Sequence, residues 1–349
     1  MKIHFLYVGN GNTIIVEHPS GRISLVDLYC SSYAFEAPLL RDFLLRGPSY
    51  QGYSILEILE KRAHEPPPTN PIEYWRNYFG YEPAFRFILT HLDEDHYKGI
   101  EQFATEIGFI NFWSTGIGID GLSNSSDSRF LKRLINGEVD GIVSLKLFAG
   151  ANSQYYGLSN PTWDWIEILY PPKEIKTKEP NIASYILKFH YGNSSLIVSG
   201  DAPPSAFEEI FEQAPYKLQC TIFVAPHHGR ETSYVGSKIL EKMNPLLVII
   251  SKGSVDENDD GTQKYRNILG SQRVWTTRYF GNIVLELTPR NDIQSIYTER
   301  YTVQAQINLI LARILRLKEI KRRTHINSAF KEALKRIYIE KAKWRQLKI

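Results

Sequence analysis

Histidine and carboxylate side chains gather directly after one apolar segment of the sequence. The segment FRFILT, residues 85–90, has the composition of a buried β-strand, and His91, Asp93, Asp95 and His96 follow it at once. Charge is costly at the end of a buried strand unless a cation offsets it, and imidazole nitrogens and carboxylate oxygens are common ligands of divalent metals. A solvated acidic turn is the alternative for the acids alone, but the flanking histidines favour a metal site.

Two later apolar segments end in the same residue types. SSLIVSGDAP places Asp201 after a strand-like run and a glycine, and TIFVAPHHG ends in His227 and His228. Each segment taken alone is compatible with an ordinary polar loop. Three such ends in series predict that their side chains converge on one or two metal ions.

The elements that must position these residues are short strands alternating with helices. KIHFLYV, TIIVEH and ISLVDLY, separated by the turns GNGN and PSG, predict an antiparallel meander in the first thirty residues. Residues 33–82 predict a helical insertion containing SILEILEKRAH and PIEYWRNYFG. Hairpins are predicted at SYILKFHYGNSSLIVSG and at RVWTTRYFGNIVLELT. Such a mixture indicates helices packed outside sheets, in one domain of residues 1–299.

The composition changes at residue 300. Residues 300–349 contain fourteen Lys and Arg and three Glu, a net charge of +11, whereas residues 1–299 contain 27 basic and 35 acidic residues, a net charge of −8. The apolar spacing predicts two basic amphipathic helices, with Ile307 and Leu311 on the apolar face of the first. The basic side chains expected to bind nucleic acid or a partner protein include Arg316, Lys321, Arg322, Arg323, Lys335 and Arg336. An anionic membrane, or the acidic body of the same chain, would also suit them.

Other features of the sequence favour a cytoplasmic protein. No apolar run reaches the length of a transmembrane segment, and the N-terminus lacks the apolar core of a signal peptide. Two cysteines, Cys30 and Cys220, exclude a disulfide scaffold.

Taken in order, these motifs resemble the metallo-β-lactamase superfamily, and most of all the soluble domain of ComEC-type DNA-uptake proteins. The motifs are YVGNGNTIIV, SLVD, HLDEDH, GDA and PHHG, and the resemblance covers about residues 1–290. The metal loop reads HxDxDH, as in that branch, where lactamases carry HxHxDH. The chain departs from the family at Asn12 and Leu28, has HHGR for HHGS, and lacks the later HP motif. The resemblance implies an αββα sandwich with a dinuclear metal site at one sheet edge, followed here by the basic helical extension.

The resemblance also assigns the catalytic and metal-binding roles. The implied set is His91, Asp93, Asp95, His96, Asp201 and His227, with His228 as the competing candidate for the last position. His91 and Asp93 would hold one ion, Asp95 and His96 the other, and Asp201 would bridge them. Because the first site is oxygen-rich, Mn²⁺ and Mg²⁺ are credible beside Zn²⁺.

The expected activity is that of a metal-dependent phosphodiesterase acting on nucleic acid, in a bacterial DNA-processing or antiphage system. Two ions would activate a shared water as the nucleophile. Candidates to orient the substrate are Asn181, Arg230, Ser233 and Lys252. Two alternatives stay open: a hydrolase of small phosphoesters or other esters with the same fold, and a subunit whose basic tail docks on a partner protein.

Overall fold

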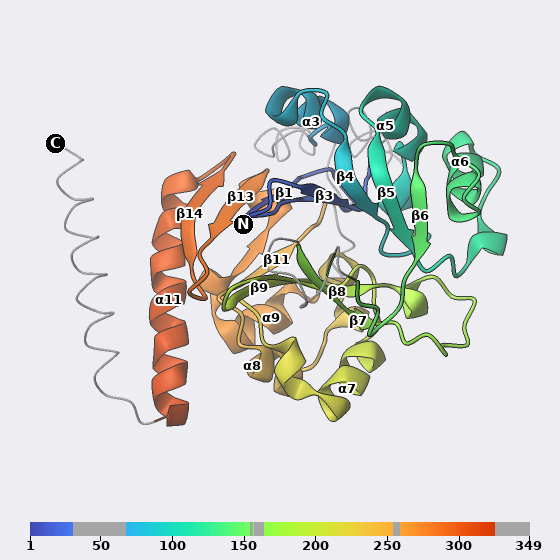
Figure 1. The fold of residues 1–349 in the computed structure, drawn as a ribbon. Helices are drawn as coiled ribbons and strands as arrows, with labels where there is room; N and C mark the ends of the chain where they lie inside the picture. Colours follow the sequence, from blue (N-terminus) through green and yellow to red (C-terminus); the bar gives the residue numbers. More distant parts are fainter. Residues whose placement is uncertain (31–67, 154–155, 157–163, 254–258, 325–349) are drawn as a thin grey trace, which may run out of the picture.

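The computed structural model describes residues 1–30, 68–153, 156, 164–253 and 259–324. Their strands form two sheets that pack face to face, and helices cover the outer face of each sheet (Figure 1). This is an αββα sandwich, so the fold class predicted from the sequence is confirmed.

The first sheet has eight strands in the order β14-β13-β1-β2-β3-β4-β5-β6. In chain order they are β1 (Lys2–Phe5), β2 (Ile14–Glu17), β3 (Ile23–Val26), β4 (Ala84–Ile88), β5 (Phe109–Ser114), β6 (Val143–Lys146), β13 (Ile283–Leu287) and β14 (Ile293–Thr298). The first three strands pair antiparallel, as the meander predicts, and β3 to β6 pair parallel.

The second sheet has six strands in the order β12-β11-β10-β9-β8-β7. They are β7 (Trp165–Tyr170), β8 (Ile186–Tyr191), β9 (Ser194–Val198), β10 (Ile222–Val224), β11 (Leu247–Ile250) and β12 (Val274–Thr276). Strands β8 and β9 form the predicted hairpin, and β9 to β12 run parallel. The carboxyl ends of β9 and β10, where the predicted ligands follow, therefore lie at the same edge of this sheet.

The helices make the outer layers. Over the first sheet they are α3 (Pro71–Phe79), α5 (Ile100–Glu106) and α6 (Ser126–Ile135), and over the second α7 (Pro204–Gln213), α8 (Ser237–Met243) and α9 (Thr262–Leu269). Helix α3 has the ends its sequence predicts, with the Asn70 side chain accepting from two backbone N–H groups and Gly80 at φ +69° closing it. Among the described helices, none combines the length and hydropathy that a membrane crossing requires.

The hairpin predicted at RVWTTRYFGNIVLELT is wrong. Its first half is β12, which pairs with β11 in the second sheet, and its second half is β13, which pairs with β1 and β14 in the first. The short helix α10 (Thr277–Phe280) carries the chain between the sheets. The GN pair, which resembles a hairpin turn in sequence, closes this helix with Gly281 at φ +68°.

Helix α11 (Thr302–Thr324) confirms the first amphipathic helix predicted after residue 300. It lies against β14, and Ala305, Leu309 and Ala312 are buried with the core between the sheets (Figure 1). The apolar face predicted for this helix is wrong: Ile307 and Leu311, expected on it, are 45% and 36% exposed, and Ala305, Leu309 and Ala312 form the buried face instead. The second predicted helix, with Lys335 and Arg336, and the insertion helix SILEILEKRAH lie outside the described residues, as do the side chains of Lys321, Arg322 and Arg323.

Candidate metal centre

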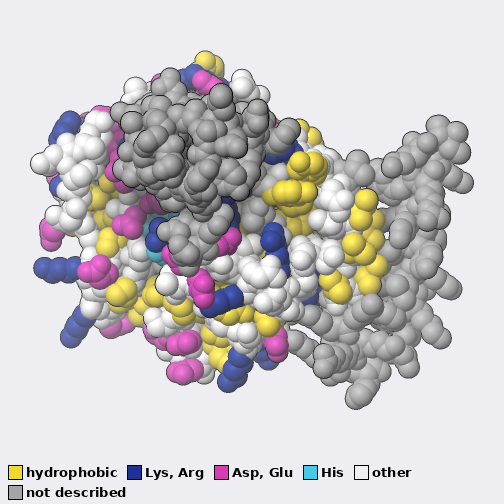
Figure 2. Space-filling model, turned by 180° about the vertical axis from the view of Figure 1, so that it is seen from behind, with side chains coloured by type: hydrophobic (Ala, Val, Ile, Leu, Met, Phe, Trp, Pro, Cys, Tyr) yellow, Lys and Arg dark blue, Asp and Glu magenta, His cyan; other side chains and the backbone are white. Residues whose placement is uncertain are grey.

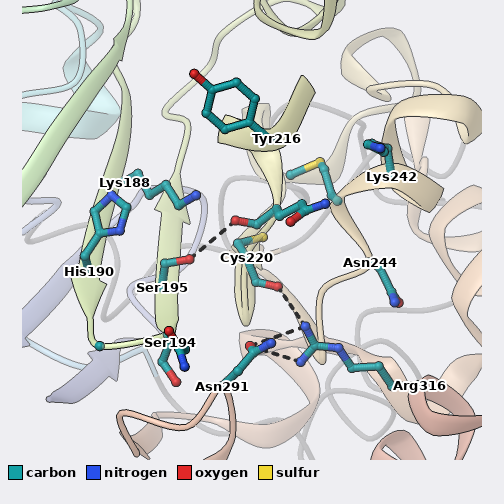
Figure 3. A pocket seen from close by; sticks show the side chains of 14 residues that line it. Lys188, His190, Ser194, Ser195, Tyr216, Cys220, Lys242, Asn244, Asn291 and Arg316 are labelled. Atoms are coloured by element: carbon teal, nitrogen blue, oxygen red, sulfur yellow. Dashed lines mark hydrogen bonds between the residues drawn. The ribbon is translucent and has the colours of Figure 1, made fainter. Parts of the chain in front are cut away.

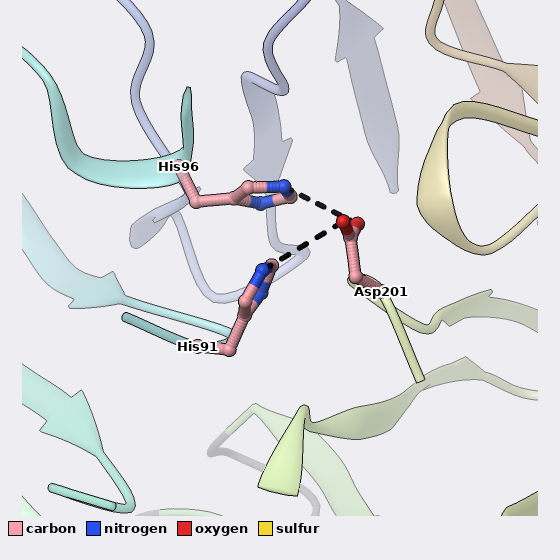
Figure 4. A group of neighbouring side chains, drawn as sticks. All are labelled: His91, His96 and Asp201. Carbon is pink, nitrogen blue, oxygen red and sulfur yellow. Dashed lines mark ion pairs between the residues drawn. The ribbon is translucent and has the colours of Figure 1, made fainter. Parts of the chain in front are cut away.

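Three buried side chains from both sheets meet at the predicted sheet edge (Figure 4). His91 follows β4, His96 lies in the short helix α4 (Glu94–Tyr97), and Asp201 follows β9 of the opposite sheet. The Nε2 atom of His96 is 3.2 Å from Asp201 Oδ1, and that of His91 is 3.7 Å from Asp201 Oδ2. Their exposed fractions are 1%, 1% and 4%.

The facing atoms of this trio lack ordinary hydrogen bonds. His91 Nε2, His96 Nε2 and Asp201 Oδ1 are buried without a hydrogen-bond partner among the residues that the structure describes. Buried polar atoms are nearly always paired, so three convergent exceptions call for a ligand. Two imidazole nitrogens and a carboxylate oxygen form a donor set that suits a divalent transition metal, and the residues therefore fit the metal that the sequence predicts.

The opposite ring nitrogens of the two histidines are already engaged. His96 Nδ1 is 2.7 Å from Asp27 Oδ2, and His91 Nδ1 is 3.1 Å from Thr90 Oγ1. Asp27 also accepts from Thr90 N at 2.8 Å and from Asn12 Nδ2 at 3.1 Å. A carboxylate that holds Nδ1 leaves the Nε2 lone pair for a metal, which is the usual arrangement behind ligating histidines.

Asp27 is a site residue that the sequence reasoning did not select. It ends the motif SLVD, and it sits at φ +56° with no exposed surface. A non-glycine residue in this left-handed region carries strain that is typically kept where a precise side-chain direction matters. The sequence did contain a signal for it: Asp27 is a charged residue directly after the apolar strand β3, which pairs with β4, the strand that leads to the metal loop.

A second group of potential ligands shares His96 with the first. Its members are Asp95, His96 and His228, whose ligand atoms lie within 4.8 Å of one another. His228 Nε2 is 3.2 Å from Asp95 Oδ2, while its Nδ1 atom is 3.0 Å from the carbonyl oxygen of Ser251. The two groups have His96 in common, and because its Nδ1 atom is held by Asp27, its Nε2 atom can serve one ion, with the other ligands left for a second.

The structure places His227 and Asp93 beside these groups rather than within them. His227 Nε2 is 3.4 Å from Asp201 Oδ2, and Ser233 Oγ lies 3.1 Å from its Nδ1 atom. Asp93 Oδ2 is 3.6 Å from His91 Nε2, and its side chain is 42% exposed. His227 and His228 both have φ near +50°, a strained pair that turns two consecutive imidazoles toward the same cluster.

The electrostatics of the centre favour bound positive charge. Burial by itself raises the pKa of Asp201, but His96, His91 and His228 hold that pKa well below its ordinary value. Burial likewise lowers the pKa of His96, yet Asp201, Asp27 and Asp95 together raise it well above its ordinary value. The cluster thus holds a proton on His96 in the place where a metal cation would supply the same charge.

The residues predicted to orient substrate are spread around the centre. Asn181 Oδ1 is buried without a hydrogen-bond partner in the described part of the chain, three residues before Ser184, whose Oγ accepts from Asp201 N at 2.9 Å. Arg230 is a surface residue whose side chain is 52% exposed and lies 3.6 Å from Asp259. Lys252 is buried, with its ammonium 2.7 Å from Asp260.

The centre reaches the surface on one face of the molecule. The side chains of His227 and His228 are 20% and 13% exposed, and Figure 2 shows a small area of histidine with basic and acidic side chains near it on one face of the molecule. A separate cavity of about 360 Å³, beside the amino ends of β9 and β10, contains none of the predicted ligands (Figure 3). It is lined in part by Arg316 of the basic extension, whose guanidinium donates to Asn291 Oδ1 and to the carbonyl oxygen of Cys220.

No protein-family model matches the sequence, and no curated protein is similar to it in sequence. Among solved structures, it resembles the metallo-β-lactamase fold protein YhfI from Bacillus subtilis, with 11% identity over 80% of this chain and 97% of that one and a TM-score of 0.43. The metallo hydrolase Igni18 from Ignicoccus hospitalis is 12% identical over 82% of this chain and 100% of its own, with a TM-score of 0.44. CmlA, a diiron β-hydroxylase from Streptomyces venezuelae, is 13% identical over 82% and 54%, also with a TM-score of 0.44. Similarities this distant carry no argument about the reaction, which rests on the residues of the chain itself.

Proposed function

We propose that this protein is a metal-dependent hydrolase that cleaves phosphodiester bonds in nucleic acid. The observation that carries the proposal is the set of three convergent, buried and unpaired ligand atoms on His91, His96 and Asp201. Asp95 and His228, which lie close to His96, are candidate ligands for a second ion. Zn²⁺ and Mn²⁺ suit the mixed nitrogen and oxygen ligands, and Mg²⁺ suits the oxygen-rich part.

When bound, two such ions would lower the pKa of a water so that it is nucleophilic at neutral pH, and would polarise the phosphoryl oxygen. The protein holds and orients the ligands: Asp27 fixes the ring of His96, and Ser184 Oγ accepts from the backbone N–H of Asp201. In the hydrolysis, the water oxygen forms a new bond to phosphorus as the ester P–O bond breaks. The leaving alkoxide takes up the proton that the water gives away, and the products are a phosphomonoester and an alcohol.

Two features support nucleic acid as the substrate. The metal loop HxDxDH resembles that of ComEC-type proteins, which supports a place in DNA processing or antiphage defence. Residues 300–349, with a net charge of +11, can supply phosphate contacts that do not depend on base sequence. The alternatives are a small phosphoester as substrate, and a partner protein bound by the basic extension.

The proposal is tested with protein stripped of metal and then given Mn²⁺, Zn²⁺ or Mg²⁺. We expect metal-dependent cleavage of labelled DNA or RNA and of bis(4-nitrophenyl) phosphate. Asp201→Asn should lower kcat/KM on the order of 10³-fold, since it weakens metal binding that contributes several kcal/mol to the transition state. Glu94→Gln is the matched control, because this exposed residue of the same loop pairs with Lys98 and belongs to neither group.

The outcomes separate the alternatives. Activity that does not depend on metal, or that survives Asp201→Asn unchanged, would contradict a metal-dependent hydrolase. Cleavage of the small diester without cleavage of nucleic acid would favour a small-molecule phosphoesterase. A protein that copurifies with the chain and is lost on removal of residues 325–349 would favour the docking subunit.

A further inference from the structure

A pocket of about 330 Å³ is lined by none of the candidate metal ligands but is connected to one of them through the chain after β11. Ser251, whose carbonyl oxygen is 3.0 Å from His228 Nδ1, is followed directly by Lys252, which lines this pocket. The backbone N–H of Lys252 in turn donates to Thr277 Oγ1 at the start of α10, next to Arg278 of the pocket wall. The two consecutive residues after β11 thus connect the metal cluster with the pocket: Ser251 contacts His228, and Lys252 lines the pocket.

Basic side chains outnumber acidic ones among the residues that line the pocket. Lys252, Arg266, Arg278 and Arg300 line it, and Asp260 is the acidic residue among its lining residues. The Asp260 carboxylate is occupied, since it lies 2.7 Å from Lys252 Nζ and accepts from Thr262 N at 2.9 Å. The wall therefore carries an excess of positive charge that suits an anionic ligand.

Arg266 has no ion pair with any acidic residue in the described part of the chain. Its guanidinium is partly buried in α9, makes no hydrogen bond or ion pair with any residue that the structure describes, and has a fully buried Nε atom. A buried Nε–H group without a partner is unfavourable, and phosphate is the group that the planar donors of a guanidinium match best. Like the metal trio, Arg266 has a buried polar atom without a hydrogen-bond partner, but here the group is a cation and would bind an anion.

An aromatic stack forms the rim of the same pocket. The rings of Tyr279 and Tyr301 are parallel within 18° at a centroid distance of 4.8 Å, and the Arg300 guanidinium lies 5.0 Å from the Tyr301 ring. Both tyrosines are about half exposed, at 50% and 47%. Tyr301 holds its ring there at φ +56°, a strained backbone for a bulky residue. A nucleobase laid on Tyr279 would continue the stack.

We propose that this pocket binds one nucleotide of single-stranded nucleic acid, beside the phosphodiester that the metal centre hydrolyses. The inference rests on the proposed function and names the strandedness of its substrate. Arg266 and Arg278 receive a phosphate, and the Tyr279 and Tyr301 stack receives the base. The pocket has the volume of a small ligand site. In a duplex the faces of each base are covered by the neighbouring stacked bases, so a base can stack on an aromatic side chain only when it is single-stranded or flipped out of the helix.

The binding experiment uses full-length, metal-free protein and a fluorescent oligothymidylate, measured by anisotropy over a series of salt concentrations. Arg266→Gln should weaken binding about tenfold and reduce the slope of log K against log salt by about 0.7, the value for one phosphate contact on a single strand. Tyr279→Ala should weaken binding about tenfold with the slope unchanged, because base stacking on an aromatic ring contributes on the order of 1–3 kcal/mol. Lys264→Gln is the matched control on α9, since Lys264 pairs with Glu231 and does not line the pocket.

Hydrolysis with metal restored separates the two proposals. Both pocket variants should raise KM for the oligonucleotide and leave kcat/KM for bis(4-nitrophenyl) phosphate within about twofold of the unmodified protein, as expected for uniform binding outside the reacting group. Equal affinity for a duplex, unchanged oligonucleotide binding in both variants, or an equal loss in Lys264→Gln would overturn the nucleotide subsite. Loss of small-diester hydrolysis in Asp201→Asn would at the same time leave the proposed hydrolase standing.

Discussion

The molecule buries two clusters of ionisable side chains near the layer between its sheets, and they differ in how their charges are satisfied. In one, Arg86 Nη1 lies 2.6 Å from Asp164 Oδ2, and His18 Nε2 is 2.7 Å from Ser24 Oγ. In the other, His91, His96 and Asp201 point unpaired atoms at a common position. Burial of charge therefore does not mark a site by itself; the convergence of several potential metal ligands does.

The two clusters also differ in net charge. Burial lowers the pKa of His18 to about 3, so this histidine is neutral, and Arg86 and Asp164 offset each other. In the metal cluster, by contrast, three carboxylates act on the single residue His96: Asp27, Asp95 and Asp201. The first cluster is complete within the protein, whereas the second needs cations from outside to be neutral.

The largest expected effect on stability is at the complete cluster. Asp164→Asn leaves Arg86 charged and unpaired in the core, so the free energy of unfolding should fall by about 3–5 kcal/mol. Urea denaturation of the metal-free protein measures this. Glu231→Gln is the control, because Glu231 and its partner Lys264 are 49% and 45% exposed and such pairs contribute at most about 1 kcal/mol. Equal losses in the two variants would remove the distinction between the clusters.

The next effect concerns the residue behind the metal trio. Asp27→Asn keeps the shape of the side chain but removes the charge that holds His96 Nδ1. We expect metal affinity to fall by about 10- to 100-fold, as is usual for partners of ligating histidines. Titration of stripped protein with Zn²⁺ against a competing chelator measures the change. Asp127→Asn, whose carboxylate accepts from Gly99 N and Glu101 N beside the metal loop, should leave the affinity unchanged.

The smallest effect is a dependence of stability on pH at His18. Its pKa is about 3 when folded and about 6.5 when unfolded, so below pH 6.5 the unfolded chain binds a proton that the folded protein does not. The free energy of unfolding should therefore decrease by about 2 kcal/mol from pH 7 to pH 5 through this residue. In urea titrations at both pH values, the free energy of unfolding of His18→Gln should fall less between pH 7 and pH 5 than that of the unmodified protein. The same dependence on pH in both proteins would show that His18 is not the source.

Much of the sandwich and the convergence of the strand ends could be predicted, because both depend on local patterns. Apolar runs, turn residues and the order of HLDEDH, GDA and PHHG are visible in the sequence. The pairing of Arg86 with Asp164, 78 positions later, and of Asp27 with His96 could not be predicted, since no local pattern specifies a distant partner. The grouping of His228 with Asp95 depends on the left-handed turn at His227 and His228, a backbone detail that the sequence does not display.

The failed hairpin has a similar cause. Alternating apolar residues and a GN pair are the same in a hairpin and in a chain that leaves one sheet to enter another. Which of the two forms depends on the competing edge strands: β11 accepts β12, and β1 accepts β13. The pocket beside the metal centre exists because of this crossing, since Arg278 and Tyr279 lie on the helix that carries it.

The pairing of β1 with β13 has a consequence for biosynthesis. One edge of β1 pairs with β2 as soon as residues 14–17 are made, but the other edge pairs with a strand about 280 residues later, which a ribosome adding 5–20 residues per second completes after roughly 15 to 60 s. The loop with His91 and His96 emerges early, whereas Asp201 and His228 come from the second half of the chain. A nascent chain therefore cannot assemble either group of ligands until most of its length has been made, and metal loading becomes one of the last steps of its maturation.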